Sequence, residues 1–127
     1  MHENEISEKI IGAAIEVHRI LGPGLLESVY EEALCHELTL RGIRFLRQQS
    51  VPIPFKGIIL GTDLRLDLLV EEKVIVDLKA KETTNPIDRA KLLTYLRLSK
   101  KHLGLLINFH VVVLRDGIER IVNNLPE

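Results

Sequence analysis

Residues 64–80 read Leu-Arg-Leu-Asp-Leu-Leu-Val-Glu-Glu-Lys-Val-Ile-Val-Asp-Leu-Lys-Ala, two apolar runs around the charged stretch Glu71–Lys73. Short apolar runs on either side of a charged turn predict a β-hairpin whose strands are buried in a sheet. Asp67 lies inside the first run, and Asp77 and Lys79 lie inside the second. Because a buried charge costs free energy unless it is paired or bound to a metal, these three residues are the first candidates for a functional site.

The length of the turn decides whether Asp67 and Asp77 meet. A three-residue loop places them directly opposite each other, with roughly 5 Å between their Cβ atoms. A two-residue loop places them on opposite faces unless a bulge intervenes. Asp77 and Lys79 are two residues apart on one strand and therefore share a face.

Two carboxylates and an ammonium group at one place suggest a specific chemistry. Carboxylate oxygens suit Mg²⁺ or Mn²⁺, and a lysine beside them could orient or deprotonate a metal-bound water, or stabilise charge on a phosphate. These are the groups needed for metal-assisted phosphodiester hydrolysis. The alternative is an internal salt bridge between Lys79 and Asp77 or Asp67, near the end of a sheet.

The composition is that of one globular domain, spanning residues 1–127. A chain of 127 residues with a net charge of −1 can bury one modest core, and it is not a polycation, although a local basic face remains compatible with it. The single cysteine, Cys35, excludes an internal disulfide and fits a reducing compartment. The N-terminus is polar, and no apolar run reaches the roughly 18 residues of a membrane span. We therefore expect a cytoplasmic protein without a membrane partner.

Helical periodicity flanks the hairpin. Apolar spacing predicts helices over residues 6–21 and 25–41, separated by Gly22-Pro23-Gly24. Asn85 as N-cap, with Pro86 at the first helical position and Asp88 at the third, predicts another helix that ends near residue 101.

Prolines predict an irregular, edge-like strand within residues 43–55. Further strands are expected at residues 58–60, 103–109, 111–114 and 118–122. This order predicts an α+β layer architecture, and a crossover through the third helix would make its sheet mixed.

Two patterns resemble a known family. Asp67, followed by Asp77-Leu78-Lys79 on the adjacent strand, looks like the motif of the PD-(D/E)xK nuclease superfamily. Residues 24–30, Gly-Leu-Leu-Glu-Ser-Val-Tyr, fit the pattern G-x-x-E-x-x-Y and resemble the GxxExxY protein family within that superfamily. The similarity extends over residues 6–122 and includes the stretches 17–24 and 104–109. It implies a restriction-endonuclease-like αβββαβ core, an α/β sandwich whose central mixed sheet is flanked by helices.

The resemblance also implies roles for individual residues. Asp67 and Asp77 would bind the metal, with the backbone carbonyl of Leu78 as a further ligand. Lys79 would position the attacking water, and Glu27 would be a helix-borne acid that completes the metal shell. The implied cofactor is Mg²⁺ or Mn²⁺, and the implied partner is nucleic acid, with DNA favoured over RNA.

One position departs from the family pattern. Many relatives carry glutamine in a Q-x-x-x-Y-L motif after the lysine strand, and Lys91 stands at that position here. A lysine could contact phosphate better than an amide does, or it could supply an internal cation that competes with the metal.

Several other side chains are candidates for substrate contact. Basic residues outnumber acidic ones after the lysine strand, which suits phosphate binding, although a solvated helix face explains some of them equally well. The candidate substrate-binding residues are Lys81, Arg89, Lys91, Tyr30 and His18. For Tyr30, the alternative is a packing role.

The sequence thus predicts a divalent-metal-dependent nuclease that hydrolyses DNA. Because a chain of this size offers little surface to grip a duplex, we also consider a homodimer. The alternative is a catalytically inactive nucleic-acid- or protein-binding module of the same fold, and a third hypothesis treats the charged cluster as structural. The sequence contains no P-loop, no dinucleotide fingerprint and no zinc-ligand spacing.

Overall fold

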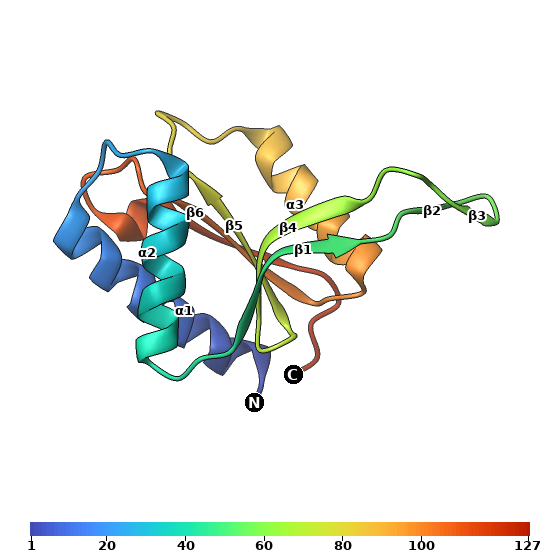
Figure 1. Cartoon of the computed structure of the whole chain (residues 1–127), viewed down its shortest axis with the longest axis horizontal. Coiled ribbons are helices and arrows are strands. Elements are labelled where there is room, and N and C mark those ends of the chain that lie inside the picture. Colours follow the sequence, from blue (N-terminus) through green and yellow to red (C-terminus); the bar gives the residue numbers. More distant parts are fainter.

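A computed structural model describes residues 1–127 and shows a five-stranded mixed sheet flanked by helices (Figure 1). The helices are α1 (Glu3–Leu21), α2 (Glu27–Leu40) and α3 (Pro86–Ser99). The sheet has the order β1 (Phe45–Val51), β4 (Leu64–Val70), β5 (Val74–Lys79), β6 (Leu103–Asn108) and β7 (Ile118–Val122). Only β5 and β6, which α3 connects, are parallel. The predicted α+β architecture with a mixed central sheet is confirmed.

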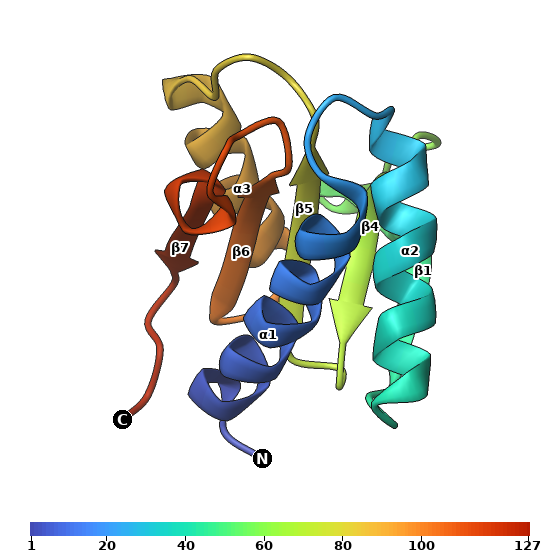
Figure 2. The same ribbon diagram turned by 90° about the vertical axis from the view of Figure 1, so that its left-hand side faces the viewer.

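The two faces of the sheet carry separate cores. Helices α1 and α2 cover one face, and α3 covers the other (Figure 2). Alternation along β5 explains the division, because Val76 packs with the first core and Ile75 with the second. On the α3 side, a Cβ atom at Gly104 would lie 3.0 Å from the side chain of Leu92. Glycine at this position therefore lets α3 approach β6 closely.

The helix ends follow local rules. Asn85 is the N-cap of α3, as predicted, and it forms a capping box, because its side chain accepts from the backbone N–H of Asp88 while the Asp88 carboxylate accepts from that of Asn85. Helix α1 ends at Leu21, and its C-cap residue Gly22 has a φ of +72°. Helix α2 begins at Glu27, two residues later than predicted, because Leu26 is extended. No helix is both long and apolar enough to cross a bilayer.

The strand predicted at residues 111–114 is wrong. The chain bends there and then forms the 3₁₀ helix η1 (Leu114–Gly117). Tertiary contacts override the β propensity of the valines, since the ring of His18 binds the carbonyl of Val111 and the Gly117 backbone packs tightly against Asn108.

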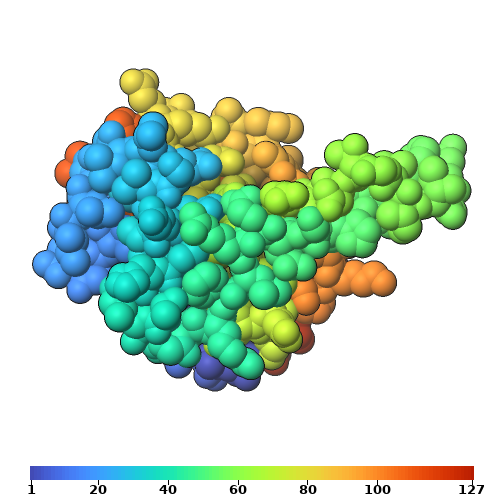
Figure 3. All heavy atoms as spheres, in the orientation of Figure 1, coloured from blue at the N-terminus to red at the C-terminus, as the bar shows by residue number.

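The irregular strand predicted over residues 43–55 divides in two. Strand β1 ends at Val51, and β2 (Pro54–Phe55) pairs with β3 (Ile58–Ile59) as a separate two-stranded hairpin. This hairpin projects away from the rest of the molecule (Figures 1 and 3). We call residues 53–60 the arm.

Candidate functional site

The hairpin of β4 and β5 closes at its turn and opens toward its other end. The pairs Val70↔Val74 and Leu68↔Val76 define a three-residue loop, as one of the two predicted registers requires. One further step in that register places Asp67 opposite Asp77, but backbone pairing has ended by then. Instead, Asp67 Oδ2 accepts a hydrogen bond of 2.9 Å from the backbone N–H of Leu78. The carboxylate thus stands between the two strands where they separate.

A kink in the neighbouring strand coincides with this opening. The β1–β4 register runs through Arg47↔Leu68 and resumes at Gln49↔Leu66, so Gln48 and Asp67 do not pair. Gln48 has a φ of +54°, in the left-handed region. A single carboxylate of α2, Glu31, accepts from Arg47 Nε at 2.7 Å and from Gln48 Nε2 at 2.8 Å.

These two contacts hold α2 against β1, beside the open end of the hairpin. Glu27 lies four residues before Glu31, on the same face of the helix, and is the first residue of α2. Glu27 therefore points to the same region as Asp67.

A cavity of about 180 Å³ lies at the opening. It contains all four side chains predicted to be catalytic, Glu27, Asp67, Asp77 and Lys79, together with Lys91. The sequence predictions missed two further charged or aromatic members, Arg65 and Tyr95. The complete lining comprises Glu27, Arg65, Asp67, Ile75, Val76, Asp77, Lys79, Lys91 and Tyr95.

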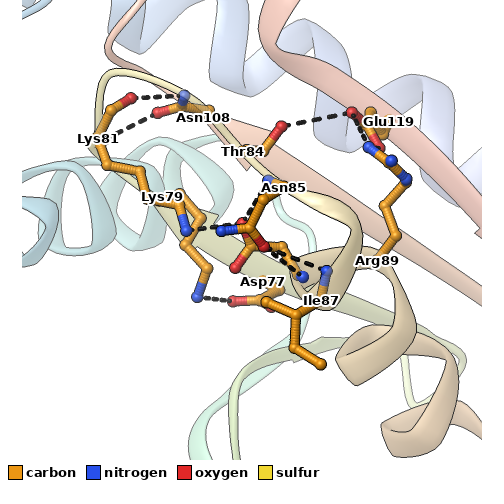
Figure 4. A network of polar contacts seen from close by, with 10 residues as sticks. Asp77, Lys79, Lys81, Thr84, Asn85, Ile87, Arg89, Asn108 and Glu119 are labelled. Atoms are coloured by element: carbon orange, nitrogen blue, oxygen red, sulfur yellow. Dashed lines mark hydrogen bonds and ion pairs between the residues drawn. The ribbon is translucent and has the colours of Figure 1, made fainter.

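Asp77 and Lys79 form an ion pair that uses only one of the two carboxylate oxygens of Asp77. Lys79 Nζ lies 3.1 Å from Asp77 Oδ1, and both side chains are largely buried (Figure 4). Asp77 Oδ2 has no hydrogen-bond partner and is the single buried side-chain polar atom in this condition. An unsatisfied buried polar atom typically costs about 1–3 kcal/mol. The predicted salt bridge therefore exists, but it leaves one carboxylate oxygen unused.

Burial and mutual repulsion perturb the acids of the cavity. Burial raises the pKa of Asp67 to about 6; the hydrogen bond from Leu78 opposes this shift, and the charges of Asp77 and Glu27 add to it. Burial also raises the pKa of Glu27, against the attraction of Lys79. For Lys79, burial alone would lower the pKa, but the charge of Asp77 and its hydrogen bond outweigh that effect and raise it.

The donor set fits a hard divalent cation. No three acidic, histidine or cysteine side chains gather closely enough to form a complete ligand cluster by themselves. Mg²⁺ does not require such a cluster, because it commonly uses one or two carboxylates together with water and phosphate oxygens. Asp67 and the free Oδ2 of Asp77 supply that minimum, and Glu27 lies on the same cavity.

Two cationic side chains in the cavity have no ionic partner. Neither Lys91 nor Arg65 forms a salt bridge, and Lys91 Nζ lies 5.5 Å from the centre of the Tyr95 ring. Arg65 could have been found from the sequence, since it precedes Asp67 by two residues on the same strand and so shares its face. Tyr95 follows Lys91 by one helical turn.

Two other predicted substrate contacts lie outside the cavity and are already occupied. Lys81 Nζ pairs with Asp88 Oδ2 at 2.6 Å, and Arg89 pairs with Glu119 at 3.3 Å (Figure 4). The backbone of Lys81 is also held in both directions by the Asn108 amide. We call Lys81, Asp88, Arg89, Asn108 and Glu119 the paired cluster.

Tyr30 and His18 also lie outside the cavity, and both are buried. Tyr30 is fully buried and stacks on Phe109 with 4.4 Å between ring centroids. Its hydroxyl donates to the carbonyl of Gly22 and accepts from the N–H of Leu25, so it ties down the turn that precedes Glu27. His18 is also buried, and its Nε2 bonds with the carbonyl of Val111 at 2.8 Å.

Comparison with known proteins identifies a structure with a similar fold and a family that the sequence matches. The chain resembles a protein whose solved structure is described as "Crystal structure of SSO0001", with a TM-score of 0.54 and 15% sequence identity. That likeness covers 79% of this chain but only 50% of the other, and it concerns the fold alone. No curated protein matches the sequence. A family profile, the PD-(D/E)XK nuclease superfamily, matches residues 4–121, a span that includes every residue of the cavity. This protein therefore belongs to the PD-(D/E)XK nuclease superfamily.

Proposed function

We propose that this protein is a divalent-metal-dependent nuclease that hydrolyses phosphodiester bonds in DNA. The observation that carries the proposal is the free, buried Oδ2 of Asp77 in a cavity shared with Asp67, Glu27 and Lys79. A carboxylate oxygen without a donor is costly in a purely structural salt bridge, but it suits a metal ligand. Glu27 at the start of α2 also supports placing the chain, through residues 24–30, in the GxxExxY family.

Mg²⁺ or Mn²⁺ would be held by Asp67, Asp77 and the backbone carbonyl of Leu78, with Glu27 completing the shell. Members of the superfamily generally use divalent metals. The ion supplies positive charge that stabilises the negative charge developing on the phosphate. The raised pKa values of Asp67 and Glu27 also indicate carboxylates that gain from a nearby cation.

Lys79 acts as a donor in this proposal. Its pKa is raised by the neighbouring acids, so the amine keeps its proton at neutral pH. A protonated Nζ held at Asp77 can orient a water molecule and stabilise charge on a phosphate.

Lys91 and Arg65 provide the contacts to nucleic acid. Both are exposed, both line the cavity, and neither has an ionic partner. Unpaired cations beside a cluster of carboxylates offset its repulsion of the phosphate backbone and bind phosphate in a salt-dependent way.

One observation favours the alternative of a binding module without turnover. Lys79 already neutralises one oxygen of Asp77, and Lys91 places a second cation in the cavity, at a position where many relatives carry a neutral glutamine. The ammonium groups of Lys79 and Lys91 could balance the negative charge of the carboxylates in place of a metal ion, and the cluster would then be purely structural.

A metal titration separates the two proposals. For a nuclease, millimolar Mg²⁺ or Mn²⁺ raises the melting temperature, and labelled DNA is cleaved only in its presence. DNA affinity that falls with salt, without any cleavage of DNA or RNA and without a metal-induced thermal shift, would instead establish the binding module.

A further inference from the structure

The arm is a short hairpin that exposes several large apolar side chains to solvent. Phe55, Ile58 and Ile59 are 57%, 60% and 63% exposed. The arm contains one strand pair with two paired positions, Pro54↔Ile59 and Phe55↔Ile58, and a hydrogen bond from the N–H of Leu60 to the carbonyl of Ile53 extends it. It stands clear of the body in Figure 3. Because two-stranded hairpins are marginally stable in water and clustered exposed apolar side chains mark interaction sites, we expect a partner to cover the arm.

A matching groove of about 550 Å³ lies on the same molecule. Its apolar lining includes Phe45, Leu46 and Leu69, and the acidic turn residues Glu71 and Glu72 border it. Leu46 is 45% exposed there.

The groove and the arm occupy opposite ends of one edge strand. Strand β1 is the first strand of the sheet and has a neighbour only on the β4 side. The groove lies where β1 begins, and the arm follows where β1 ends. The length of β1 keeps the arm away from its own groove. A two-fold axis beside β1 would bring the arm of each copy to the groove of the other, which is the self-complementary arrangement of a symmetric dimer.

The charges at the two surfaces are complementary. The tip of the arm carries Lys56, whose Nζ lies 5.6 Å from the centre of the Phe55 ring. In the groove, Glu71 is paired with Arg44, whereas Glu72 is exposed and forms no ion pair. With only one cation and several apolar side chains, the arm suits a protein surface better than a phosphate backbone.

We propose that the arm of one copy docks into the groove of a second copy, so that the protein forms a homodimer through two equivalent arm–groove contacts. This inference does not depend on metal binding or on cleavage.

Ile53, at the base of the arm, packs against the second core, but Phe55 and Ile58 belong to neither core and can be replaced without disturbing the fold. We expect the wild type to sediment as a dimer at high concentration. Phe55→Ser with Ile58→Ser should weaken association at least tenfold while leaving circular dichroism unchanged. Val112→Ser is the matched control, since Val112 is 89% exposed outside both surfaces and its replacement should leave association intact. A wild type that stays monomeric at hundreds of micromolar, or a dimer unaffected by the arm variant, overturns the proposal.

Charge reversal tests which surfaces meet. Lys56→Glu and Glu72→Lys should each weaken the dimer several-fold, and the double variant should recover part of the loss, because the pair is restored with its signs exchanged. Additive losses in the double variant overturn the pairing.

Cysteine cross-linking tests the geometry directly. Ile58→Cys and Leu46→Cys, mixed as two separate proteins, should form a disulfide-linked heterodimer under mild oxidation. The native Cys35 will not interfere, since it is buried and burial raises the pKa of its thiol to about 11. Failure to cross-link, combined with arm variants that lose DNA affinity as monomers, would assign the arm to nucleic acid and overturn the dimer.

Discussion

Two groups of charged side chains lie close together along β5 and α3, and they differ in how completely they are paired. In the paired cluster, Lys81 binds Asp88, Arg89 binds Glu119, and Asn108 satisfies the backbone of Lys81 (Figure 4). In the cavity, Lys91 and Arg65 have no ionic partner, and one oxygen of Asp77 is unsatisfied.

The difference shows that charge density alone does not mark a site. The paired cluster is balanced internally, and the hydrogen bond from Lys81 holds the pKa of Asp88 below its usual range. The cavity instead raises the pKa of Asp67 and Glu27, because burial and like charges leave their ionised forms under-stabilised. Replacing residues in the cavity should therefore affect function, whereas replacing residues in the paired cluster should affect stability.

The largest expected effect is on catalysis, at Asp77. Asp77→Asn keeps the size of the side chain but removes the anionic oxygen. Metal-dependent DNA cleavage should fall by at least about 1,000-fold, equivalent to roughly 4 kcal/mol. A fluorescent oligonucleotide assay measures the rate. Arg89→Gln in the paired cluster is the control and should change the rate by less than about threefold, and a comparable loss there would abolish the distinction.

The next effect is on stability, at Asp88. Asp88→Ala removes half of the capping box of α3 and the partner of Lys81. Urea unfolding should show a loss of about 1–3 kcal/mol, with the metal-induced rise in melting temperature retained. Glu82→Ala, at an exposed acid without an ion pair, should lose little stability. If Asp88→Ala abolished metal binding, the two groups would not be independent.

A smaller effect concerns the pH dependence at Asp67. Because its folded pKa of about 6 exceeds the unfolded value, the folded state binds more protons between about pH 4 and pH 6, and the metal-free protein loses stability as pH rises through that window. Asp67→Asn should remove this slope and make the metal-free protein more stable at pH 7 by about 1–2 kcal/mol, after allowance for solvent screening.

For metal binding, the wild type is expected to have the advantage over Asp67→Asn. Protons compete with the ion below pH 6, so wild-type metal affinity should rise with pH up to that point, and Asp67→Asn should bind metal weakly at every pH. Isothermal titration at pH 5 and pH 7 measures this. An unchanged affinity in the variant would remove Asp67 from the metal site.

The smallest effect is on nucleic-acid affinity, at Lys91. Lys91→Gln should weaken DNA binding a few-fold at low salt and reduce the slope of log affinity against log salt by about 0.7–0.9. Arg97→Gln, an exposed position on the same helix, should leave the slope unchanged. Equal effects at both positions would indicate non-specific attraction by the whole helix.

Much of the fold could be predicted from local signals. Two apolar runs around residues 71–73 predicted the hairpin, although they left two registers open, and Asn85, Pro86 and Asp88 predicted the start of α3. These features depend on residues within a few positions of one another. The strand expected at residues 111–114 failed because its competing contacts come from His18 and Asn108, which are distant in sequence or on another strand.

The sequence by itself determined which residues could form a site, through the pattern of Asp67, Asp77 and Lys79 and the motif around Glu27. Only the tertiary structure decided which cationic side chains remain available to bind phosphate. Lys81 and Arg89 form ion pairs with residues on other elements, whereas Lys91 and Arg65 form none. The tertiary structure also decided that the arm stands alone beside an empty edge. The physical reason is range, since a hairpin turn and a helix cap follow from neighbouring residues, whereas the pairing of a charge depends on every element that folds against it.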